Sequence, residues 1–166
     1  LSAFATDTEV VASLAPVIEA LVGPPDEFAR LLPVLQAAVD PSDPAVWGAH
    51  VLEDRFDGAP APDLLFPVAQ FDETVPPSSA KALARGLRLP HLSPVPDPVP
   101  MLEVVDGPLM GNGPGGATVA YFQLDRVTSG GAVEAAHHGN VPASDQVRWM
   151  MLGLFGGHLS GSAVLA

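Results

Sequence analysis

The chain has 166 residues, the size of one globular domain, and 48% of them are hydrophobic against 16% that are charged. The formal net charge is −12, and the seven Lys and Arg residues are scattered singly, which argues against a nucleic-acid partner because phosphate binding relies on clustered basic side chains. The absence of cysteine excludes disulfides, thiolate metal sites and a catalytic cysteine. The mean hydropathy of +0.30 predicts extensive apolar burial, either within the chain or against another one.

Residues 1–45 form the first predicted unit, a helical segment of the cap or lid type. A Ser/Thr-x-x-Glu capping box at residues 6–9 opens an apolar run that ends near Leu21, and a second run with helical spacing covers residues 27–39. Pro16 and Pro33 lie inside these runs and are expected to break both helices. The alternative, to which we give equal weight, is that these helices pack in the core of the domain.

Residues 46–166 form the second predicted unit, with α/β layering. A continuous apolar run predicts a buried strand over 64–69, and Ser78 is placed to cap a helix that Gly86 ends. The later predicted elements are strands over 101–105 and 117–124 and a helix that Ser144 caps and Gly156–Gly157 ends. Two segments are predicted as loops, the proline-rich residues 89–100 and residues 125–141. This order of elements favours parallel strands flanked by helices.

The first predicted strand is followed by an acidic side chain and a Val-Pro turn. Asp72 lies where a rigid strand passes into a short loop, which is the position of a catalytic acid that holds an imidazole in one tautomer. Glu73 is adjacent and competes for this role. The alternative interpretation is that both carboxylates are solvated charges at a strand terminus.

The predicted loop after the last strand carries adjacent histidines. Two neighbouring imidazoles in an extended loop cannot both point at one site, so one of His137 and His138 is expected to act as the base. We favour His138, because the following Gly139 permits a tight exit from the loop. A pair of exposed loop histidines is the alternative.

Other chemistries fit the sequence less well. His137, His138, Asp72 and Glu73 are metal-ligand types, but no fixed ligand spacing joins them, so no metal or cofactor is expected. His50, His91 and His158 are isolated in sequence. In a Ser-Asp-His triad with the acid before the histidine, the nucleophilic serine stands in a Gly-x-Ser-x-Gly elbow. None of the ten serines of this chain stands in such a motif.

Taken together, these motifs resemble the C-terminal half of an α/β-hydrolase. The similarity rests on Asp72-Glu73-Thr74-Val75-Pro76, the helix after it, the strand through Tyr121-Phe122, the His-Gly loop and the closing helix. The closer likeness is to the large lipase-like hydrolases of bacteria, of the lipoprotein or virulence-factor lipase type. In them a helical segment like residues 8–39 and an Asp-Pro-x-Asp-Pro turn precede the acid-bearing strand. The resemblance covers about residues 8–155.

The resemblance implies a serine carboxylic-ester hydrolase, an esterase or lipase. It assigns Asp72 as the triad acid and His138 as the base, with His137 as the alternative alignment, and it implies a secreted or cell-envelope location. The serine, its elbow and the oxyanion-hole amides match nothing in these residues. We therefore expect this chain to be inactive by itself and to require an N-terminal chain or segment of the same hydrolase, or a homo-oligomer.

A second hypothesis is a non-catalytic acidic binding or assembly module whose Asp and His are incidental. It predicts a compact monomer in which Asp72 and His138 lie far apart.

Overall fold

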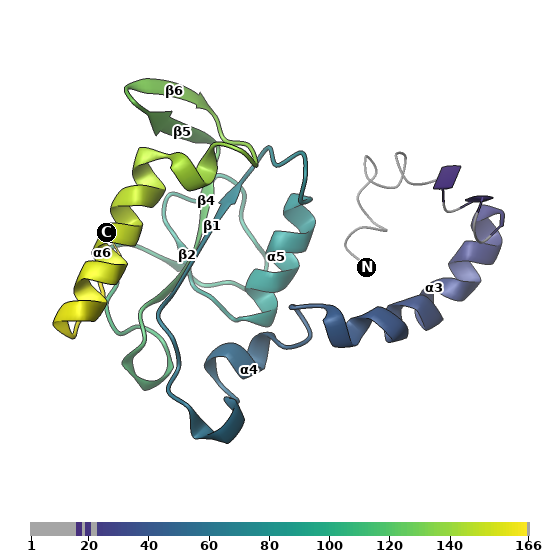
Figure 1. The fold of residues 1–166 in the computed structure, drawn as a ribbon, viewed down its shortest axis with the longest axis horizontal. Coiled ribbons are helices and arrows are strands. Elements are labelled where there is room, and N and C mark those ends of the chain that lie inside the picture. The colour runs from purple at the N-terminus through teal and green to yellow at the C-terminus, as the bar shows by residue number, and fades with distance from the viewer. Residues whose placement is uncertain (1–15, 18, 21–22, 166) are drawn as a thin grey trace.

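The structure is a computed structural model that describes residues 16–17, 19–20 and 23–165 (Figure 1). The first part of this region holds α3 (Pro25–Val39), η1 (Asp40–Ser42), α4 (Gly48–Leu52), η2 (Phe56–Gly58), β1 (Leu64–Ala69) and α5 (Pro77–Gly86). Then follow β2 (His91–Leu92), β3 (Val104–Val105), η3 (Pro114–Gly116), β4 (Val119–Leu124), β5 (Arg126–Ser129), β6 (Ala132–Ala135), η4 (Val141–Ala143) and α6 (Asp145–Ser160). Within the described residues, no helix has the length and apolar character needed to cross a bilayer.

A four-stranded parallel sheet with the order β1-β4-β2-β3 forms the centre of the fold. The longest pairing joins β1 to β4, with Leu64 beside Val119 and Ala69 beside Leu124. Since both strands end together, the loops that follow them leave from the same edge of the sheet. The predicted α/β class with parallel strands is therefore confirmed.

Helices cover the two faces of this sheet. Figure 1 shows α5 on one side of β1 and α6 on the other, while α3 extends away from both layers. Alternate side chains of the strands supply two separate cores. The core under α5 contains Val68, Ala80, Ala84, Leu87, Leu89, Val119 and Tyr121, and the core under α6 contains Ala69, Leu92, Phe122, Leu124, Val147, Met150 and Leu154.

The helix α6 forms as its sequence predicts at the start and differs at the end. The Ser144 hydroxyl accepts the Val147 N–H at 3.3 Å and so caps the first turn. The predicted end at Gly156–Gly157 is wrong, because the helix continues to Ser160. It ends at Gly161, whose φ of 88° is the left-handed conformation that closes many helices.

Two other helix predictions also need correction. α3 runs unbroken through Pro33, so the expected break there is wrong. The Ser78 side chain makes no capping hydrogen bond, because α5 already begins at Pro77, where a proline tolerates the unpaired first turn. The capping box at residues 6–9 and the run to Leu21 lie largely outside the described residues.

Several short strands were not apparent from the pattern of residues. The proline-rich segment 89–100 contains β2, and the predicted loop 125–141 contains the antiparallel hairpin β5–β6. The strand predicted over 101–105 is reduced to Val104–Val105. These elements are two to four residues long and are defined by pairing with distant partners, which a local pattern does not contain.

Candidate active site

Asp72 lies in the turn that follows β1, and the backbone of that turn binds its carboxylate. One oxygen, Oδ1, accepts the N–H of Thr74 at 2.8 Å and the N–H of Val75 at 2.7 Å. This is the geometry in which an aspartate closes its own turn, and Pro76 then stiffens the path into α5. The other oxygen, Oδ2, is directed to the loop that carries His138.

The electrostatics of this turn favour an ionised Asp72. Burial raises the pKa of the carboxyl, but the Val75 N–H, the His138 side chain and the Thr74 N–H outweigh it and hold the pKa below its ordinary value. The side chain is 13% exposed. Asp72 is therefore a carboxylate with a fixed orientation at neutral pH.

The histidine loop begins where the hairpin β5–β6 returns to the end of β4. Ala136 N–H donates to the carbonyl of Asp125, which closes the base of the hairpin at 2.9 Å. Asn140 then fixes the tip, because its Oδ1 accepts the His137 N–H and its Nδ2 donates to the Ala135 carbonyl, both at 2.9 Å. These three hydrogen bonds set the direction in which His138 leaves the backbone.

The structure brings Asp72 and His138 together. His138 Nδ1 lies 3.1 Å from Asp72 Oδ2. Asp72 follows β1, and His138 follows the hairpin β5–β6, which leaves from the end of β4, the parallel neighbour of β1. The imidazole is 49% exposed, in contrast to its carboxylate partner. The large separation that the binding-module hypothesis predicts is thus wrong. An imidazole held at Nδ1 by a carboxylate presents its Nε2 on the opposite side of the ring, as a general base requires.

The neighbouring pair, His137 and Glu73, has a different arrangement. His137 Nδ1 lies 3.9 Å from Glu73 Oε1 and accepts the Gly139 N–H at 3.2 Å. Glu73 Oε2 accepts the backbone N–H of His138 at 3.3 Å. The Glu73 N–H and then this His138 N–H lower the pKa of the Glu73 carboxyl. Glu73 therefore contacts the backbone of the histidine loop, while Asp72 contacts the imidazole.

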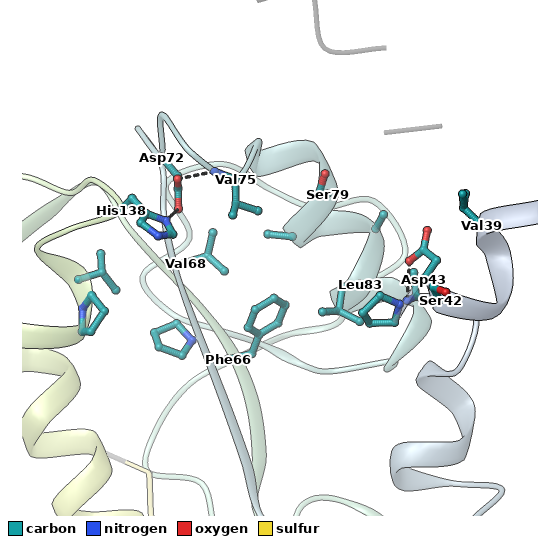
Figure 2. A pocket seen from close by; sticks show the side chains of 18 residues that line it. Val39, Ser42, Asp43, Phe66, Val68, Asp72, Val75, Ser79, Leu83 and His138 are labelled. Carbon is teal, nitrogen blue, oxygen red and sulfur yellow. Dashed lines mark hydrogen bonds and ion pairs between the residues drawn. The ribbon is translucent and has the colours of Figure 1, made fainter. Parts of the chain in front are cut away.

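The pair lies at one end of a pocket of about 710 Å³ between β1, α5 and the turn after α3. Figure 2 shows Asp72 and His138 at one side of this pocket and Val39, Ser42 and Asp43 at the other. Apolar side chains form most of the lining between them: Phe66, Pro67, Val68, Ala69, Val75, Ala80, Leu83, Val141 and Pro142. This lining suits an apolar group beside a polar reacting centre.

Two serines of the chain, Ser42 and Ser79, line the same pocket. Figure 2 places Val75 between Ser79 and His138, with the Ser79 hydroxyl directed away from the imidazole. Ser79 lies in the first turn of α5 and Ser42 in η1, so neither occupies the strand-to-helix elbow of a nucleophilic serine.

The remaining histidines lie outside this site. His50 Nδ1 bonds to the Asp54 carbonyl at 2.7 Å, and His158 Nδ1 lies 2.8 Å from Asp63 Oδ2. His91 is completely buried beside Tyr121, and burial lowers its pKa. Among the described residues, no group of three or more His, Cys, Asp or Glu side chains is arranged to hold a metal ion.

Sequence reasoning missed two contributors to the site, Asn140 and the amide of Val75. A signal for both is present in hindsight. An aspartate followed by Glu-Thr-Val-Pro is typical of a turn closed by its own side chain, and His-His-Gly-Asn is typical of a tight loop that an asparagine stabilises.

Comparison with known proteins provides no identification. No family model, curated protein or solved structure matches the chain.

Proposed function

We propose that this chain supplies the acid and the base of a serine carboxylic-ester hydrolase, an esterase or lipase. The observation that carries the proposal is the Asp72–His138 contact of 3.1 Å at the carboxyl ends of two adjacent parallel strands, beside an apolar pocket. In open α/β sheets this edge is where ligands bind.

The two residues have distinct roles in the reaction. His138 removes the proton from a serine hydroxyl as the oxygen attacks the ester carbonyl, and returns it to the departing alcohol. Asp72 holds the imidazole through Nδ1 and stabilises its cationic form, which its ionised state permits. Water repeats the cycle on the acyl-enzyme with His138 again as the base. The apolar lining from Val75 to Leu83 contacts the acyl chain.

The nucleophilic serine comes from a further segment of the same hydrolase. Ser42 and Ser79 lie on the wrong kind of element for this role. A serine that enters beside β1 with its hydroxyl near Nε2 of His138 completes the triad. The oxyanion-hole donors come from the same segment.

A fluorophosphonate probe, which labels activated serines, tests the proposal. The 166-residue chain should remain unlabelled and should not turn over p-nitrophenyl butyrate, whereas the protein extended upstream of Leu1 should do both. Labelling of the short chain that disappears in Ser79→Ala would show that the nucleophile lies within these residues. The proposal fails if the extended protein shows neither labelling nor hydrolysis.

Substitutions in the extended protein test the individual roles. We expect His138→Ala and Asp72→Asn each to lower kcat by roughly 10³–10⁴-fold, the usual loss when one triad member is removed. His137→Ala is the matched control and should retain most of the activity. Loss of activity in His137→Ala alone would assign the base to His137 instead.

A further inference from the structure

The pocket beside the Asp72–His138 pair has a second polar end. Ser42 and Asp43 lie there, across the apolar lining from the imidazole (Figure 2). Asp43 is half-buried, and its Oδ1 accepts the Ala45 N–H at 2.9 Å, so the turn holds the carboxylate in place. A carboxylate has acceptor sites for about four hydrogen bonds, so Asp43 can close its turn and bind a ligand donor at the same time.

This polar end is built on the last turn of α5. A Cβ on Gly86 would lie 2.6 Å from the Ala45 carbonyl oxygen, and a Cβ on Gly48 would lie 2.4 Å from the Gly86 carbonyl carbon. The two glycines therefore allow the backbone of residues 45–48 to pack directly on the end of the helix. The position of Asp43 is thus fixed relative to α5, which lines the rest of the pocket.

The charge of the lining favours a cation at this end. Among the described residues that line the pocket there is no Lys or Arg, and the acidic ones are Asp72 and Asp43. His138 accompanies Asp72 at the catalytic end, so Asp43 sets the charge of the far end. The whole chain also has a net charge of −12. The far end therefore attracts a cationic group and repels a carboxylate or a phosphate.

The Ser79 hydroxyl adds a further polar group to the lining. Its oxygen is buried and has no hydrogen-bond partner among the described residues. A buried hydroxyl without a partner is costly, and so is the removal of water from a carboxylate by an apolar group. An unsubstituted fatty acyl chain would leave the Ser79 hydroxyl unpaired and would strip water from Asp43. The lining therefore indicates an acyl chain that carries a polar group.

The strand β1 indicates how far this polar group lies from the ester. Phe66 to Ala69 form one wall of the pocket, and Ala69 is at the end that leads to Asp72. Three steps along a strand cover about 10 Å. An extended chain covers this length in about eight bonds, because the three backbone bonds of one residue span at most about 3.6 Å. We take this wall as the length of the apolar chain.

We propose that the Ser42–Asp43 end of the pocket binds a primary ammonium group, so that the substrates are esters of amino-terminated acyl chains. The inference rests on the proposed function and names the substrate class of the same site. The ammonium group donates to the Asp43 carboxylate, with the Ser42 and Ser79 hydroxyls as further acceptors for its three donors. The apolar chain contacts Leu83, and the ester carbonyl lies beside His138. Hydrolysis releases the ω-amino acid and the alcohol.

Two matched esters test the proposal in the protein extended upstream of Leu1. The p-nitrophenyl esters of ω-aminooctanoic acid and of nonanoic acid have the same length and differ in an ammonium group against a methyl group. We expect kcat/KM at neutral pH to be about tenfold higher for the amino ester, the effect of one hydrogen bond between charged groups at a half-buried site. Equal values, or a preference for the nonanoate ester, overturn the proposal.

Substitutions of two aspartates provide the matched comparison. Asp43→Asn keeps the size of the side chain and the acceptor of the turn but removes the charge, and it should abolish the preference for the amino ester. Asp40→Asn removes one charge from η1, outside the lining, and should keep the preference. Because the readout is a ratio of two substrates, a loss of folded protein lowers both values and leaves the ratio unchanged. An equal loss of preference in both variants overturns the proposal, because the effect then reflects the overall charge.

Binding of octylamine separates the amine site from the hydrolase function. In calorimetric titrations of the extended protein, octylamine should bind about tenfold more tightly than octanol, and Asp43→Asn should remove the difference. This result without hydrolysis of either ester keeps the amine site and refutes the serine-hydrolase function. Hydrolysis without a preference for the amino ester keeps the hydrolase and refutes the amine site. Equal binding of octylamine and octanol also refutes the amine site.

Discussion

The turn that holds Asp72 allows its structural and catalytic contributions to be separated. In Asp72→Ala both acceptors of the carboxylate are lost, and the Thr74 and Val75 N–H groups lose partners at 2.8 and 2.7 Å. A hydrogen bond to a charged acceptor contributes about 1.5 kcal/mol where water reaches the site, the lower end of the usual range. Losing two such bonds should therefore lower the free energy of unfolding by about 3 kcal/mol. Asp72→Asn keeps a neutral acceptor at Oδ1, so each of the two hydrogen bonds still contributes about 1 kcal/mol. This substitution should therefore lower the free energy of unfolding by only about 1 kcal/mol in total.

Urea unfolding of the extended protein at pH 7 measures these differences, with Asp106→Asn as the control on an exposed aspartate. The pKa of Asp72 is lowered in the folded state, so its charge stabilises the fold above the unfolded value of 3.8 and loses this effect as the pH falls through the lower folded pKa. The difference between wild type and Asp72→Asn should accordingly shrink below about pH 4. Equal destabilisation by Asn and Ala at pH 7 would refute this reasoning, because the turn would then depend on the charge and not on the acceptor at Oδ1.

Three further predictions concern the framework around the site. His91 is buried with a lowered pKa, so below its unfolded value of 6.5 the unfolded state binds more protons at this residue than the folded state does. Stability should therefore fall by at most about 1.4 kcal/mol per pH unit between pH 6.5 and 5.5, a loss absent in His91→Phe by urea unfolding. Gly157→Ala should lower the melting temperature, since its Cβ would meet backbone at 2.4 Å, whereas Gly156→Ala, where no atom lies within 4 Å, should not. Asn140→Ala should lower kcat while leaving the melting temperature within a few degrees of wild type, because it loosens the exposed loop that positions His138. An unchanged kcat would show that this asparagine does not position the loop.

The elements that were predictable from the sequence are those that a single local pattern defines. The apolar run of Leu64–Ala69 gives a strand because nothing polar interrupts it, and Val147, Met150 and Leu154 give a helix face because their spacing follows one turn. The break expected at Pro33 is not observed, because the sequence pattern contains only part of what determines whether a helix continues. The pattern shows that one hydrogen bond is lost, but it does not contain the neighbouring bonds that keep the helix continuous.

For the candidate site, the sequence by itself determined the residue types and their order: an acid after one strand, histidines after a later one, and no serine elbow. It left open which carboxylate meets which histidine, because neighbouring residues in a loop differ only in direction. The tertiary structure decided this, since β1 and β4 end together and the turn amides hold Asp72 toward His138 while Glu73 contacts the loop backbone. Only the tertiary structure also showed that β1 is the end strand of the sheet among the described residues. Pairing and coverage depend on segments distant in sequence, and those are fixed only when the chain is folded.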